Sequence, residues 1–168
     1  MRHRAPHAFT FTCLPALLSV LLLGSFVLPA QAANQPAKQG PWLSVSATAK
    51  LKSGQSVQVR GSGFDVRKGV YVAFCVAPKP GQAPTPCGGA PGSATASSAA
   101  WIATNPPAYA KGMTTPFGKG GSFAVPITVS TMIGDIDCRV ASCGIAARAD
   151  HRRSQDRSQD VFVPVSFQ

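Results

Sequence analysis

Several patterns that mark particular functions are missing from this sequence. No C-x-x-C pair is present and His151 is isolated, so we predict no metal site. Gly61-Ser62-Gly63 lacks the third glycine of a phosphate-binding loop, since Val66 stands there, and no helical pattern follows. Basic residues are not interleaved with aromatic ones, as they are in single-strand binders. These absences argue against a metalloprotein, a nucleotide-binding enzyme and a single-strand binder.

No catalytic constellation is present either. A Ser-His-Asp triad would have to use His151 with Asp150, but adjacent side chains in an extended segment point apart, and no nucleophile turn occurs. Asp135 and Asp137 lie two apart beside Cys138, where they could bind a cation or form a solvated turn. We therefore predict that the protein is not an enzyme.

Acidic residues are scarce, because the sequence has no glutamate and only 6 aspartates against 16 lysines and arginines. The formal net charge of +10 favours acidic partners such as nucleic acid, an anionic wall polymer or a membrane surface. The alternative is a basic exported protein that is simply soluble. We expect a monomer.

The first 32 residues have the layout of a secretory signal peptide. A basic start with Arg2 and Arg4 precedes an apolar run from about Leu14 to Leu28, and residues 29–32 supply an A-x-A cleavage site. A membrane anchor, the alternative, would need about 20 uninterrupted apolar residues. We predict a signal peptide at 1–32, a flexible lead-in at 33–41, one domain at 42–168 and secretion, with possible attachment to the cell wall.

Four cysteines follow the signal peptide, and an even number in an exported chain predicts two disulfides. Four cysteines allow three connectivities, and the spacing favours the local pairs Cys75–Cys87 and Cys138–Cys143.

Strand patterns dominate the rest of the chain. Apolar residues alternate with polar ones at 43–47 and 57–61, the period of a half-buried strand, and further strands are expected at 70–75, 122–129 and 143–149. The last strand, at 161–167, alternates Val161, Val163, Val165 and Phe167 against Phe162, Pro164 and Ser166. Pro126 predicts that its strand lies at an edge or carries a bulge. Six or seven strands without a helix indicate an all-β protein, a seven-stranded immunoglobulin-like β-sandwich with two disulfides.

A long segment at about 77–121 interrupts this regularity. It is rich in Pro, Gly, Ser and Ala, and we expect long loops with one short strand at 99–103. Its aromatic residues Trp101, Tyr109 and Phe117 are candidates for ligand contact, or else a small core under the loops. The tetrapeptide Arg-Ser-Gln-Asp occurs twice in tandem, at 153–156 and 157–160.

At the cysteines the sequence resembles the neocarzinostatin family. The segments that carry the resemblance are 43–46, 58–64, 71–75, 136–144 and 165–168. The resemblance implies a secreted actinobacterial antibiotic apoprotein with a seven-stranded immunoglobulin-like fold and disulfides at 75–87 and 138–143. It also implies a cleft that holds an enediyne chromophore non-covalently, protects it and releases it to cut DNA. No other cofactor is expected.

Three positions depart from the chromoprotein pattern. Ala77 replaces a cleft-lining tryptophan, Gly144 a glutamine, and Arg148 a serine that faces the chromophore. An arginine in the cleft suits a more anionic ligand than a polyyne. Segments 148–151 and 157–161 are more similar to neocarzinostatin-like modules of actinobacterial envelope proteins, for which cell-surface or haem-acquisition roles are suggested.

Two hypotheses follow from the sequence. The first is a non-enzymatic carrier with a small apolar or anionic ligand in a cleft between sandwich and loops; the residues expected to line it are Phe74, Trp101, Tyr109, Phe117, Phe123 and Arg148. The second is an envelope adhesion or haem-acquisition-associated module that holds no enediyne.

Overall fold

The computed structural model describes residues 40–89 and 96–168. The predicted signal peptide at 1–32 and all but the last two residues of the lead-in lie outside the described residues, so both stay predictions. Within the described part, every regular element is a β-strand or a single turn of 3-10 helix.

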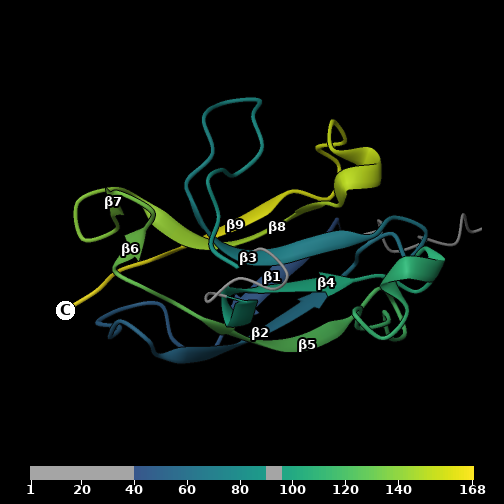
Figure 1. Ribbon diagram of the computed structural model, residues 1–168, viewed down its shortest axis with the longest axis horizontal. Helices are drawn as coiled ribbons and strands as arrows, with labels where there is room; N and C mark the ends of the chain where they lie inside the picture. Colours follow the sequence, from purple (N-terminus) through teal and green to yellow (C-terminus); the bar gives the residue numbers. More distant parts are fainter. Residues whose placement is uncertain (1–39, 90–95) are drawn as a thin grey trace, which may run out of the picture. The chain divides into compact units, whose positions relative to one another are not determined.

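Seven strands form two antiparallel sheets that pack face to face (Figure 1). The three-stranded sheet has the order β1 (Trp42–Val45), β2 (Ser56–Ser62), β5 (Phe123–Thr128). The four-stranded sheet has the order β4 (Ala99–Ile102), β3 (Val70–Val76), β8 (Cys143–Ala149), β9 (Val161–Val165). The predicted all-β fold with seven sandwich strands is confirmed, including the short strand expected at 99–103.

The remaining elements are short. A hairpin of β6 (Met132–Ile133) and β7 (Ile136–Asp137) precedes the second disulfide. Three 3-10 turns complete the set: η1 (Ala96–Ser98), η2 (Ala108–Ala110) and η3 (His151–Arg153). The sequence did not predict the hairpin, because two-residue strands are too short to show a period.

The core lies between the two sheets and follows from the alternation of each strand. On β2, Val57 and Val59 are fully buried while their neighbours are exposed, and β5 repeats this pattern with Val125 and Ile127. Gly61 stands opposite Phe123, and a Cβ there would lie 2.3 Å from a carbon of the ring. The glycine therefore gives the Phe123 ring its space, and Gly61-Ser62-Gly63 forms the end of β2 rather than a phosphate-binding loop.

Pro126 stands on β5, which pairs only with β2 and is an edge strand. A proline cannot donate a ladder hydrogen bond, so an edge is where it is tolerated. The edge position that its presence predicts is confirmed.

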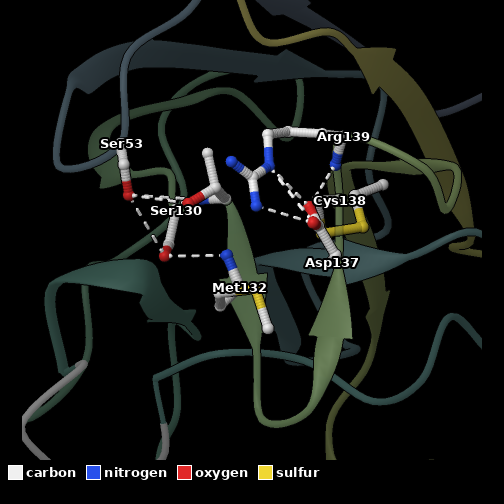
Figure 2. The surroundings of a disulfide bond; sticks show 8 residues. Ser53, Ser130, Met132, Asp137, Cys138 and Arg139 are labelled. Atoms are coloured by element: carbon white, nitrogen blue, oxygen red, sulfur yellow. Dashed lines mark hydrogen bonds and ion pairs between the residues drawn. A yellow bond between two sulfur atoms is a disulfide. The ribbon is translucent and has the colours of Figure 1, made fainter.

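Both predicted disulfides are present, Cys75–Cys87 and Cys138–Cys143. Figure 2 shows the second one beside a polar cluster in which the Asp137 carboxylate faces the Arg139 guanidinium. Arg139 donates from Nε to Asp137 Oδ1 at 2.9 Å and from a terminal nitrogen to Oδ2 at 2.7 Å. Nearby, Ser130 Oγ accepts from the Met132 amide at 3.1 Å, which helps hold the start of the hairpin.

The Arg139 side chain gives Asp137 a testable pH response. Hydrogen bonds from Arg139 lower the pKa of Asp137 to about 2, against about 4 for an ordinary aspartate. A lowered pKa stabilises the folded state above the unfolded value, and this contribution is lost as pH falls toward 2. We expect NMR titration to place the Asp137 carboxyl near 2 in the native protein and nearer 4 in Arg139→Gln. Equal values in the two proteins would contradict this.

Candidate functional site

The outer face of the four-stranded sheet, the one turned away from the core, carries unusually small side chains. Ala73 on β3 and Ala146 on β8 are buried there and pack against Ala99 on β4. Gly144 continues the row, and a Cβ there would lie 2.3 Å from the carbonyl oxygen of Val163. Because their side chains are small, these residues form a shallow depression, the floor, on a sheet face that is ordinarily exposed to solvent in β-sandwiches.

The loop after β3 covers part of this floor. It rises from the sheet on the same side as the segment around η3 (Figure 1). The Cys75–Cys87 disulfide closes it, and the amides of Val76 and Gly88 donate to the carbonyls of Pro86 and Phe74, both at 2.9 Å. The backbone of the loop is thus fixed to the strand from which it departs.

A cavity of about 280 Å³ lies between this loop and the floor. Tyr71, Ala73, Ala99 and Arg148 line it from the sheet, and the loop contributes residues 87–89. Its volume is close to the lower end of the range of about 300–1,000 Å³ for small-molecule sites. The wall is apolar or uncharged except at Arg148.

Among the described residues, Arg148 is therefore the one charged group that lines this cavity. It lies directly opposite Tyr71 in the β3–β8 register, and its Nη1 donates to the carbonyl of Pro84 at 3.2 Å. Among the described residues no carboxylate lies within ion-pair distance of it. A guanidinium carries five N–H donors in a planar fork, which matches a carboxylate or sulfonate oxygen pair.

Tyr71 forms the end of the cavity and belongs to a hydrogen-bonded aromatic cluster. Its hydroxyl lies 2.5 Å from His151 Nδ1, and the Tyr109 hydroxyl lies 2.8 Å from Nε2 of the same ring. Burial raises the pKa of the Tyr71 phenol, and the nearby Asp150 carboxylate raises it further. Tyr71 consequently stays neutral and contributes no charge to the cavity.

Asp150 holds this cluster in place through hydrogen bonds. Its side chain is fully buried, and its Oδ2 accepts from Trp101 Nε1 at 3.2 Å and from Arg152 Nε at 3.0 Å. Trp101 packs against Tyr71 with ring centroids 5.6 Å apart. Asp150 and His151 are adjacent but bind different partners, since the carboxylate accepts from Trp101 and Arg152 and the imidazole contacts two tyrosine hydroxyls.

The structure does not bring the six predicted ligand residues together in one place. Arg148 lines the cavity, and Trp101 packs beside its Tyr71 wall. Tyr109 is 70% exposed on η2. Phe74 and Phe123 belong to the core between the sheets, where Phe74 packs against Phe167, and Phe123 packs with Phe64 and Phe117.

The cavity residues that sequence reasoning missed are Tyr71, Ala73, Ala99 and the loop residues 87–89. Small residues seldom attract attention as ligand contacts. One signal was present, because Tyr71, Ala73 and Cys75 alternate with core residues on β3 and therefore share the outer face.

Within residues 40–89 and 96–168, no three His, Cys, Asp or Glu side chains are placed to hold a metal ion. The same part of the chain contains no helix long and apolar enough to cross a membrane.

The chain has two packed antiparallel sheets, two disulfides and an outer sheet face that a loop partly encloses. These features define a class of small β-sandwich proteins. The neocarzinostatin family model matches residues 43–167, and the chain belongs to that family. Among solved structures it is similar to macromomycin, with 16% identity, a TM-score of 0.51, and coverage of 77% of this chain and 100% of that one. A solution structure of apokedarcidin gives 17% identity, a TM-score of 0.45 and the same coverage. The comparison with curated proteins gave no match.

Proposed function

We propose that this protein is a non-enzymatic carrier that holds a small ligand on the outer face of the four-stranded sheet. The ligand has an apolar body, which lies over Ala73 and Ala99, and an anionic group, which pairs with Arg148. The observation that carries the proposal is the cavity of about 280 Å³ with a single charged group in its wall.

Physical chemistry supports an anionic ligand here. Half-buried arginines are ordinarily paired with a carboxylate. Five of the six aspartates in the described chain pair with an arginine or lysine, and none of these partners is Arg148. Arg148 instead donates to a neutral carbonyl. A charge-assisted hydrogen bond from Arg148 would contribute about 1.5–3 kcal/mol to ligand affinity.

The family membership supports a carrier role, since the resemblance implies a non-covalently held chromophore. Arg148, Ala77 and Gly144 distinguish this site from the pattern expected for an enediyne. We therefore propose a different, anionic ligand for the same kind of site. Export through the predicted signal peptide belongs to this proposal, because a carrier with two disulfides requires an oxidising compartment.

Two fluorescent probes with the same rings test the proposal. 1-Anilinonaphthalene-8-sulfonate carries a sulfonate, and N-phenyl-1-naphthylamine is its neutral counterpart. We expect the sulfonate to bind saturably at one site per chain. In Arg148→Gln its affinity should fall about tenfold or more, since that is the value of one charge-assisted hydrogen bond. The neutral probe should bind the native protein and Arg148→Gln alike.

Two further variants serve as controls. Lys52→Gln removes one exposed positive charge outside the cavity and should leave both affinities unchanged. Ala99→Leu fills the cavity and should weaken both probes. An Ala99→Leu variant that binds both probes like the native protein would refute this location of the site.

A further inference from the structure

A second concave surface lies on the outer face of the other sheet. The groove has a volume of about 460 Å³, and its lining includes Trp42, Arg60, Ser62, Thr115, Ser122 and Phe123. β1, β2 and β5 supply its floor, and the segment that leads from β4 to β5 supplies its rim. Because the cavity with Arg148 lies on the four-stranded sheet, the two surfaces are separate.

Trp42 is the most unusual residue of this groove. Leu43 and Val45 of β1 pack against the core, so Trp42 points outward, and it is 45% exposed. It stands opposite Ser62 on β2. A half-exposed indole on a flat sheet edge adds nothing to the core but offers a broad aromatic face to a ligand.

The charge of the groove is positive and uncompensated. Arg60 is exposed, and no aspartate belongs to the groove lining. Every ion pair in the described chain lies elsewhere, at Asp65, Asp137, Asp150, Asp156 and Asp160. The groove therefore combines one aromatic plate, one guanidinium and several hydroxyl groups.

We propose that this groove binds a saccharide that carries a carboxylate, such as a uronic acid unit of an acidic polysaccharide. The apolar C–H face of a sugar ring would lie on the Trp42 indole. The carboxylate would pair with Arg60, whose planar fork fits two carboxylate oxygens. Ser62, Thr115 and Ser122 would exchange hydrogen bonds with the sugar hydroxyls.

The composition of the groove favours an acidic saccharide over nucleic acid. Single-strand binders stack successive bases on several aromatic side chains along a basic groove. Here only Trp42 exposes a large aromatic face, and one cation lines the floor. A single acidic sugar ring could use the indole, the guanidinium and the hydroxyl groups of this lining together.

NMR of the native chain provides the test, because the two tryptophans give two indole N–H signals. Trp42→Phe assigns them. The probe is a galacturonic acid trimer, and maltotriose is the neutral comparison. We expect the trimer to shift the Trp42 indole signal saturably while the Trp101 signal stays in place. Arg60→Gln should weaken the trimer at least fivefold, to the affinity of maltotriose, and Trp42→Ala should weaken both sugars at least tenfold.

Lys52→Gln is the matched control, since it removes an exposed positive charge that is not part of the groove lining. An equal loss of affinity in Lys52→Gln and Arg60→Gln would overturn the proposal, because the net charge of the protein alone would then explain the loss. No shift of the Trp42 signal at saturating trimer would overturn it as well. A single-stranded oligonucleotide that binds more tightly than the trimer, with steep salt dependence, would identify a nucleic-acid surface instead. None of these outcomes bears on the naphthalene probes, so the carrier proposal is tested independently.

Discussion

Replacement of Asp150 with alanine is expected to lower the free energy of unfolding by about 1–3 kcal/mol, the usual cost of leaving a buried hydrogen-bond donor without its acceptor. The Asp150 side chain is fully buried and accepts from Trp101 Nε1 and from Nε, Nη2 and the backbone amide of Arg152. Alanine would leave the Trp101 indole N–H unpaired in the interior. It would also release Arg152, which holds the carbonyl of Asn105 in the neighbouring loop.

Urea denaturation followed by circular dichroism measures this loss. Asp135→Ala is the matched control, because Asp135 is exposed and forms no ion pair among the described residues, and it should change stability by less than about 0.5 kcal/mol. Asp150→Asn keeps the shape and one acceptor and should fall between the two. A loss below 1 kcal/mol in Asp150→Ala would show that Asp150 does not anchor the aromatic cluster.

Removal of the Cys75–Cys87 disulfide by a double alanine substitution should cost about 3 kcal/mol, because the bond closes a loop of 12 residues' separation. Removal of Cys138–Cys143, with a separation of 5, should cost about 2 kcal/mol in the same model. Thermal unfolding of the two double variants compares them directly.

The two disulfides should differ more in binding than in stability. Cys75–Cys87 fixes the loop that walls the cavity, and Cys87 itself lines it. Its removal should weaken the anilinonaphthalene sulfonate strongly. Removal of Cys138–Cys143 should leave probe affinity unchanged wherever the protein remains folded. If both variants lost the probe equally, the loop would not be the wall of the site.

The sequence predicted the sandwich well because its strands bury one face and expose the other. The period of two at β2 and β5, the edge position of Pro126 and the cysteine spacing each report a local constraint. The β6–β7 hairpin escaped prediction because each strand has two residues. Asp137, considered as a turn residue or a cation ligand, begins a turn in which its carbonyl accepts from the Val140 and Ala141 amides, and its carboxylate pairs with Arg139.

The candidate site was harder to predict for a physical reason. Aromatic residues were chosen as ligand contacts, but a large ring is as useful to a core as to a cavity. Phe74, Phe117 and Phe123 pack with other phenylalanines. The tandem repeat also shows that local sequence does not determine whether a residue is buried. Gln159 is buried and accepts from the Asp65 amide, whereas Gln155, in an identical tetrapeptide, is exposed.

The central strands of the four-stranded sheet are covered on both faces, by the core on one side and by loops on the other. Nearly every residue of β3 and β8 is buried as a result. A floor of this kind is already packed before a ligand arrives, so binding would not require the sheet to rearrange. The arrival rate of the ligand would be governed by diffusion and by the positive field of the protein. Differences in affinity among ligands would then appear as differences in residence time.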